Sequence, residues 1–199
     1  LIIDGLVWFA QFLMLTQEID LYQYLGLIYF ESDNFMVYQL LTNMFLHNPH
    51  DPMHLFFNMF AVFMFGMVLE AVWGSKRFLI YYLVAGLGAS IIQELSWVYD
   101  YREVILNPVI ERINTGEHIY TRQEFFNLIR AVGASGAVFG ILVAFGMLFP
   151  NVELMIMFIP VPIKAKWFVI GYGVLELFLG FGNFSGDNVA HFAHLGGLF

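Results

Sequence analysis

The sequence has few charged residues and no cysteine. Only 12% of its 199 residues are charged, whereas soluble domains carry about 25%. So few charges cannot cover a water-facing surface, and we expect the lipid bilayer to be the solvent. The absence of cysteine excludes disulfides and thiolate chemistry. Lysine and arginine number only 8 and the formal net charge is −8, which argues against a nucleic-acid partner.

Apolar residues are abundant, at 60% of the chain, and they are grouped in long runs. A membrane-spanning helix needs about 20 mostly apolar residues. Six segments meet or approach this length: Leu1–Leu15, Met53–Val72, Phe78–Val98, Ala131–Phe149, Trp167–Phe181 and Val189–Phe199. The first and last run to the ends of the sequence, so we expect both helices to be truncated. The pattern predicts an all-α, polytopic membrane helix bundle with a six-helix core, forming a single domain over residues 1–199.

Two stretches are too polar to span a bilayer. Residues 16–52 are rich in acidic and aromatic side chains, and we expect them to lie at the membrane interface. Residues 99–130 form a long, soluble-looking loop, with a possible short helix at each end. We interpret this stretch as an extramembrane insertion within the domain.

The positions of the basic residues predict the topology, because lysine and arginine are enriched in short cytoplasmic loops. Lys76 and Arg77 follow the second segment, and Lys164 and Lys166 follow the fourth. Residues 16–52 contain neither type. The N-terminus is therefore expected in the cytoplasm, and segments two, four and six enter the membrane from the external face.

Three of these segments carry polar residues at a similar depth below that face. His54 and Asn58 lie in the first two turns of segment two, Ser135 about one turn into segment four, and His194 about two turns into segment six. Polar groups inside a membrane are costly, and they usually line a cavity or meet a partner. We therefore expect these four side chains to line one water-filled depression.

The residue types suit acyl transfer. Ser135 is a candidate nucleophile, and His194 is a candidate general base because imidazole titrates near neutral pH. Backbone N–H groups near the start of segment four favour a developing anion. Gly133 and Gly136 leave room for a substrate carbonyl.

A hydrogen-bonding pair and the lack of an acidic partner complete the predicted site. His54 and Asn58 are four residues apart on one helix face, so both can donate hydrogen bonds to an oxyanion. Among the acidic residues, Asp187 precedes segment six and Glu176 lies in segment five, but neither is an obvious third member. We therefore expect a Ser135–His194 dyad without a metal or other cofactor.

Four motifs in this order resemble those of the rhomboid intramembrane serine proteases: "HLFFNMF" (54–60), "GMVLEAVWGS" (66–75), "GASG" (133–136) and "AHLGG" (193–197). The resemblance implies a multi-pass protein that cleaves transmembrane substrates. It also implies the plasma membrane, with an active site that opens to the non-cytoplasmic face.

The resemblance also assigns roles to single residues. It implies nucleophile Ser135, base His194, and oxyanion support from His54 and Asn58. The catalytic histidine of the family has a glycine three residues later, which Gly197 supplies for His194, whereas His191 has His194 at that offset. Phe139 stands where an aromatic residue packs on the catalytic histidine.

The chain departs from the family pattern in two places. Tyr38 and Gln39 stand where bacterial members often have a Trp-Arg pair, and the loop "LHNPHDPMH" (46–54) is about two residues longer than usual. Both departures concern loop shape and substrate access.

Two alternatives of other classes remain open. One is a catalytically silent, rhomboid-like protein that binds and escorts membrane proteins. The other is a histidine-box metalloenzyme, using two clusters near one face: His47, His50 and His54, with His191 and His194. The sequence carries no signal for an oligomeric state.

Overall fold

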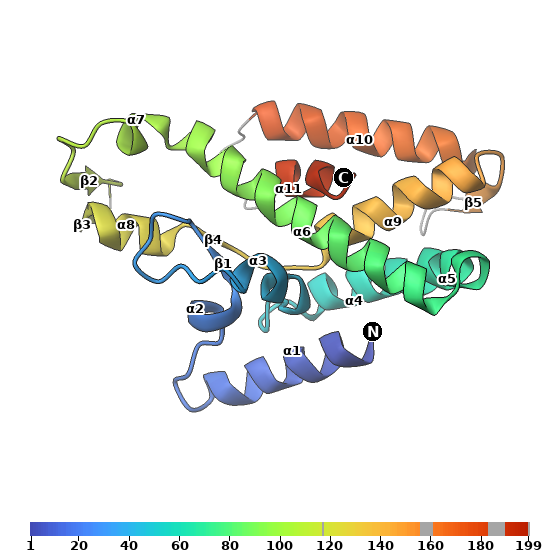
Figure 1. Ribbon diagram of the computed structural model, residues 1–199, viewed down its shortest axis with the longest axis horizontal. Coiled ribbons are helices and arrows are strands. Elements are labelled where there is room, and N and C mark those ends of the chain that lie inside the picture. Colours follow the sequence, from blue (N-terminus) through green and yellow to red (C-terminus); the bar gives the residue numbers. More distant parts are fainter. Residues whose placement is uncertain (117, 156–160, 183–189, 199) are drawn as a thin grey trace.

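The protein is an all-α helix bundle, as the sequence predicts. The computed structural model describes residues 1–116, 118–155, 161–182 and 190–198. Each of the six predicted segments contains a helix: α1 (Ile2–Leu15), α4 (Pro52–Ala61) continued by η2 (Val62–Gly66) and α5 (Met67–Trp73), α6 (Ser75–Asp100), α9 (Ser135–Leu148), α10 (Ala165–Gly182) and α11 (His191–Gly196). Figure 1 shows α6, α9 and α10 packed around α11.

Short elements connect these helices. Residues 16–52 hold α2 (Tyr22–Leu25), β1 (Leu27–Ile28), α3 (Gln39–Thr42) and the 3₁₀ turn η1 (Asn43–Phe45). The strands form three small antiparallel pairs: β1 with β4 (Arg130–Ala131), β2 (Arg112–Asn114) with β3 (Ile119–Thr121), and β5 (Glu153–Met155) with β6 (Pro162–Lys164). None of these pairs forms a larger sheet in the part of the chain that the structure describes.

The second segment is one continuous helix from Pro52 to Trp73, with an unusual interior. Asp51 caps its start by accepting hydrogen bonds from the backbone N–H groups of Met53 and His54, and Pro52 occupies the first turn, where its missing N–H is not needed. Residues 62–66 form a π-helical stretch, wider than an α-helix. The helix ends at Gly74, whose φ of +80° favours glycine, and α6 begins at the next residue.

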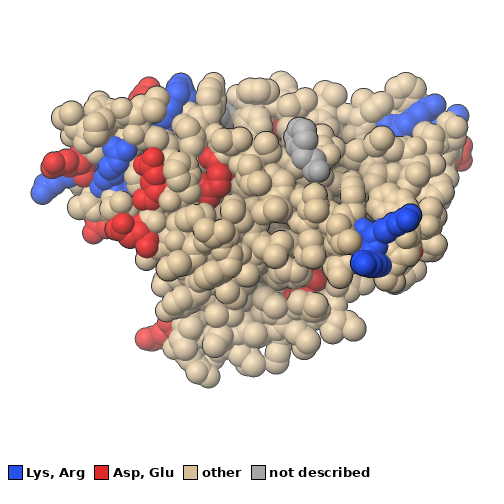
Figure 2. All heavy atoms as spheres, in the orientation of Figure 1, with Lys and Arg blue, Asp and Glu red and all other residues tan. Residues whose placement is uncertain are grey.

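Length, exposure and charge agree with a membrane-embedded bundle. Within the described residues, two helices are long and apolar enough to cross a bilayer, Pro52–Trp73 and Ser75–Asp100. Large apolar side chains point outward along the helices, among them Ile2, Phe57, Leu95 and Phe178. In Figure 2 the charged side chains gather at the two ends of the long axis, and the surface between them is almost free of charge on the face shown.

The central helix is α9, and it is shorter than a bilayer is thick. Ten of its 14 residues are buried. The main hydrophobic core contains Ala137, Val138, Ile141, Ala144 and Phe145 of this helix, together with Leu69 of α5 and Tyr82 and Ala85 of α6. A helix of 14 residues is about 21 Å long, against about 30 Å for the hydrocarbon layer. Helix α9 therefore begins or ends below a membrane surface.

The start of α9 corrects one expectation. The sequence predicts a helix from Ala131, but Arg130 and Ala131 pair with β1 and the helix begins only at Ser135. Because strand pairing satisfies the backbone of residues 130–131, this non-helical segment is tolerated inside the bundle. Ser135 is thus the first residue of the helix, rather than one turn into it.

Glycines allow three helices to approach backbone to backbone. A Cβ atom on Gly140 of α9 would collide with the carbonyl oxygen of Gly197, which follows α11, and would lie 3.0 Å from Cβ of Ala85 on α6. A Cβ atom on Gly197 would collide with the carbonyl oxygen of Gly136. Small residues at such crossings are typical of membrane helix packing.

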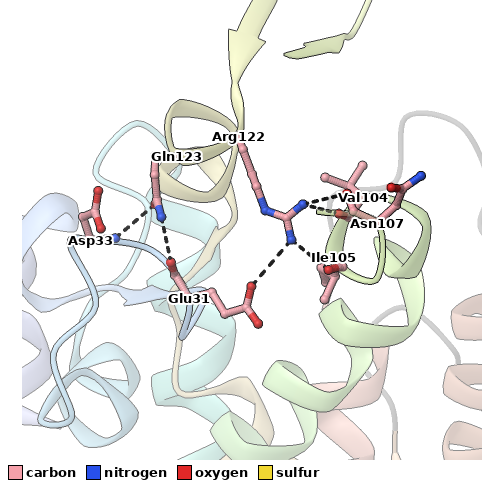
Figure 3. Close-up of polar contacts among 7 residues, drawn as sticks. All are labelled: Glu31, Asp33, Val104, Ile105, Asn107, Arg122 and Gln123. Atoms are coloured by element: carbon pink, nitrogen blue, oxygen red, sulfur yellow. Dashed lines mark hydrogen bonds and ion pairs between the residues drawn. The ribbon is translucent and has the colours of Figure 1, made fainter. Parts of the chain in front are cut away.

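The described residues of the stretch 99–130 lie mostly at one end of the bundle, next to the end of α6 (Figure 1). There, Phe126 and Ile129 share a small core with Leu27, Tyr29 and Trp97. The stretch contains the expected short helix at each end, α7 (Arg102–Ile105) and α8 (Arg122–Leu128), and the β2–β3 hairpin, which the sequence did not predict. The Arg122 guanidinium holds it together by donating hydrogen bonds to the carbonyls of Val104, Ile105 and Asn107 (Figure 3).

We predict that Gly140→Ala destabilises the protein by about 1–3 kcal/mol, because the added methyl group has no space between α9, α11 and α6. The measurement is equilibrium unfolding in detergent. Gly171→Ala on α10 is the matched control, since nothing lies within 4 Å of its Cβ position. Equal stability of the two variants would contradict the proposed close contact.

We also predict that Arg122→Lys loosens the 99–130 cluster without unfolding the bundle, since an ammonium group cannot bond three carbonyls in the fork geometry of guanidinium. Amide hydrogen exchange of residues 102–107 should accelerate, while that of α9 stays unchanged. Arg112→Lys serves as the control because the Arg112 side chain is exposed on β2. Unchanged exchange at residues 102–107 would argue against the role of Arg122.

Candidate active site

Ser135 lies at the start of α9, at the end of a tightly constrained turn. Gly133 has a φ of +133°, which residues with a side chain rarely adopt, and its N–H donates a hydrogen bond to the carbonyl of Asn43. The first backbone N–H groups of a helix have no partner within it. Ser135 is half-buried, and its hydroxyl therefore lies close to several backbone N–H groups that can donate hydrogen bonds.

His54 faces the same turn from α4. A Cβ atom on Gly133 would lie 3.0 Å from Nε2 of His54 and 3.7 Å from Oγ of Ser135, so the imidazole and the hydroxyl flank this glycine. The N–H of Asn48 donates to Nδ1 of His54 over 3.4 Å. Because Nδ1 accepts, the neutral ring carries its proton on Nε2, and His54 presents a hydrogen-bond donor toward Ser135.

Asn58 lies one turn deeper on the same face of α4 and is buried. Its amide nitrogen donates a hydrogen bond to the carbonyl of His54 over 2.8 Å. One N–H of the amide is thus used within the helix, and the other remains for a substrate.

His194 is buried and is the fourth residue of the short helix α11, rather than two turns into a helix as the sequence suggested. Its turn is packed on the turn of Ser135: a Cβ atom on Gly136 would lie 2.9 Å from the carbonyl oxygen of Ala193. Among the described residues, however, no hydrogen bond joins Oγ of Ser135 to the His194 ring. Catalytic hydrogen bonds often tighten only when substrate binds.

The surroundings of His194 include a residue that the sequence interpretation set aside. Nδ1 of His194 lies 3.0 Å from Oε2 of Glu176 on α10, and Nδ1 of His191 lies 2.6 Å from the same oxygen. The ring of Phe139, the residue expected beside His194, contacts the ring of Tyr172, at 5.4 Å between centroids. Asp187 lies outside the described residues. The Glu176 contact depends on how α10 packs against α11, so no spacing rule could reveal it.

A small cavity of about 30 Å³ adjoins Ser135 and has room for a water molecule. Asn43, Ser90 and Gln93 supply polar groups to its lining, and Asn43 donates to Ser90 over 2.8 Å. Gln39 is one of the two residues that stand where bacterial rhomboids often have a Trp-Arg pair. It is fully buried, and its amide nitrogen donates hydrogen bonds to the backbone carbonyls of Tyr24 and Asn34. These residues hold the interfacial segment against the site.

Four histidines of the histidine-box alternative make two kinds of contact. His47 packs edge-on against His54, whereas His191 and His194 meet Glu176. In the described part of the chain, these last three form the one group of metal-ligand type, with ligand atoms within 4.8 Å of one another. Tetrahedral zinc ligands stand about 3.4 Å apart. The distances of 2.6 Å and 3.0 Å from Oε2 of Glu176 to the two histidine nitrogens are shorter than this spacing and are typical of hydrogen bonds.

The comparison with known protein families agrees with this geometry. Residues 34–199 match the family described as the Rhomboid domain. No curated protein matches the chain.

We predict that acid destabilises the protein partly through His47, which lies in the loop before α4. Burial, together with the neighbouring His54, lowers the pKa of His47 to about 4. Since the unfolded chain binds this proton near pH 6.5, stability falls as the pH drops from 6.5 to 4, by at most about 1.4 kcal/mol per pH unit.

The measurement is the free energy of unfolding in detergent at about pH 7 and at about pH 4.5. Most of the pH interval over which His47 affects stability lies between these two values. His47→Leu should lose less stability than the wild type over this interval, whereas His118→Gln, which replaces an exposed histidine, should behave like the wild type. Parallel losses in all three proteins would rule out His47 as the sensor.

Proposed function

Because the chain belongs to the rhomboid family of integral membrane proteins, we propose that it is an intramembrane serine endopeptidase. Members of this family are generally serine proteases that act on transmembrane proteins in the bilayer. The proposed substrates are membrane proteins cut in or next to a transmembrane helix, at a site that opens to the non-cytoplasmic face of the plasma membrane.

The observation that carries the proposal is the meeting of three helices at Gly133 and Gly136. His54 and Ser135 flank the first glycine, and the turn of α11 that holds His194 packs on the second. A nucleophile, a donor and an imidazole base are therefore gathered in one place below the bundle surface. This arrangement supports acyl transfer.

The proposed reaction follows from these positions. Oγ of Ser135 attacks the scissile carbonyl carbon while His194 accepts the hydroxyl proton. The carbonyl oxygen becomes an oxyanion, which Nε2–H of His54, the free amide N–H of Asn58 and the backbone N–H groups of α9 stabilise. His194 then gives the proton to the departing amine, and the C–N bond breaks to leave an acyl-enzyme.

Water completes the cycle. A water molecule from the cavity attacks the ester carbonyl, His194 takes its proton, and the proton returns to Oγ of Ser135 as the carboxylic acid leaves. A helical substrate hides its carbonyls in its own hydrogen bonds, so it must unwind locally to be cut. The reaction needs no metal or other cofactor.

A catalytically silent escort protein is the second candidate. It is favoured by two observations: Ser135 makes no hydrogen bond to His194 in the described structure, and Phe139 turns toward Tyr172. The experiment that follows separates the two.

We predict that a fluorophosphonate probe labels the detergent-solubilised wild type at Ser135. Labelling requires an activated hydroxyl, so Ser135→Ala should abolish it and His194→Ala should reduce it by a factor on the order of 100 or more. Ser96→Ala, which removes an exposed hydroxyl on α6, is the matched control and should label like the wild type. Absence of labelling in a folded wild type would favour the escort protein.

A further inference from the structure

Glu176 is a carboxylate in the middle of the apolar helix α10. Only 3% of its surface is exposed, although an ionisable group at membrane depth is expensive unless it is paired. Its position calls for specific partners.

The partners come from two helices. Oε2 of Glu176 lies 2.6 Å from Nδ1 of His191 and 3.0 Å from Nδ1 of His194, both on α11. The hydroxyl of Tyr172, one turn earlier on α10, is a further donor to the same carboxylate. His191 and Tyr172 thus hold the carboxylate in place while it faces the ring of His194.

This contact has a consequence for the protonation of His194. A carboxylate can only accept hydrogen bonds, so the nitrogen that faces it carries the proton. In a neutral imidazole, protonation of Nδ1 leaves the lone pair on Nε2, at the opposite edge of the ring. Nε2 is thereby the basic nitrogen, and it faces away from α10.

We propose that Glu176 is a positioning residue for His194: it fixes the ring in the tautomer with basic Nε2 and stabilises the imidazolium formed when Ser135 loses its proton. The 3.0 Å contact between Nδ1 of His194 and Oε2 of Glu176 is that of an ion pair rather than of an aligned hydrogen bond. The proposal rests on the serine-protease function above and adds a third residue to the expected dyad.

A purely structural role is the competing explanation, since the contacts also tie α10 to α11. Replacement of Glu176 would then lower stability and leave the kinetics of the folded enzyme unchanged. The two explanations differ in kcat and in the pH dependence of the rate.

The test compares wild type, Glu176→Gln and Glu94→Gln. The Glu176→Gln change keeps the size of the side chain and removes its charge. Glu94 is the matched control because it is also buried, on α6, and bonds the N–H of Phe30 rather than a histidine. The readouts are kcat and KM for a transmembrane peptide substrate, the rate of fluorophosphonate labelling, and the pH profile of kcat/KM.

We expect Glu176→Gln to lower kcat at least about tenfold and to leave KM within about twofold of the wild-type value. The upper bound on the loss of kcat is about 10⁴-fold, which is the effect of the Asp→Asn change in a Ser-His-Asp triad. The acidic limb of the pH profile should move to lower pH, because the imidazolium loses its anionic partner while His54 and His191 still face it. Glu94→Gln should match the wild type in all readouts.

A folded Glu176→Gln variant with wild-type kcat and pH profile would overturn the proposal, while labelling of the wild type would leave the protease function standing. A wild type that is not labelled and does not cleave the substrate would overturn both the role of Glu176 and the proposed protease function. If Glu176→Gln does not fold, nitrogen-15 spectra of histidine-labelled wild type decide: an unprotonated Nε2 in His194 supports the proposal, and an unprotonated Nδ1 overturns it.

Discussion

Direct contact between backbones holds the candidate site together. Helix α9 brings Ser135, and the turn of α11 brings His194, but neither side chain reaches the other unless the helices nearly touch. Gly136, Gly140 and Gly197 remove the side chains that would separate them. In lipid, where apolar surface drives little helix association, such close packing is a main source of attraction. The contact that stabilises the bundle thus also sets the distance between Ser135 and His194.

A second constraint comes from the solvent. Irregular backbone at membrane depth must find hydrogen-bond partners within the protein. The chain meets this need before Ser135 by pairing β4 with β1 and by bonding Gly133 to Asn43. The interfacial segment 16–52 therefore supports the turn before Ser135, as well as covering the bundle. Gln39 and Asn43 extend the same support, through buried amides that bond Tyr24, Asn34 and Ser90.

Much of this arrangement could be predicted from the sequence, and the limits have physical causes. Apolar runs predict the helices because lipid demands them, and the polar residues within those runs mark the candidate site. The start of α9 was misplaced because Ala131 and Val132 are as apolar as the helix itself, and only pairing with Leu27 and Ile28 makes residues 130–131 extended. The Glu176 contact was missed because it depends on how α10 packs against α11, which spacing does not determine. The roles of Ser135, His194, His54 and Asn58 remain predictions.

The π-helical stretch at residues 62–66 has a consequence for how the chain can change over evolution. Each residue of an α-helix turns the direction of its side chain by about 100°, so one residue gained or lost normally rotates everything beyond it. A π-turn already contains such an extra residue. A single deletion within 62–66 can therefore convert it to regular α-helix without breaking the helix. That change would keep the face of His54 and Asn58 nearly in phase with Leu69, which is fully buried in the core at the other end, because the wide turn had already absorbed the extra residue. The stretch is therefore a point at which the chain can gain or lose one residue while the candidate site keeps its register with the opposite end of the bundle.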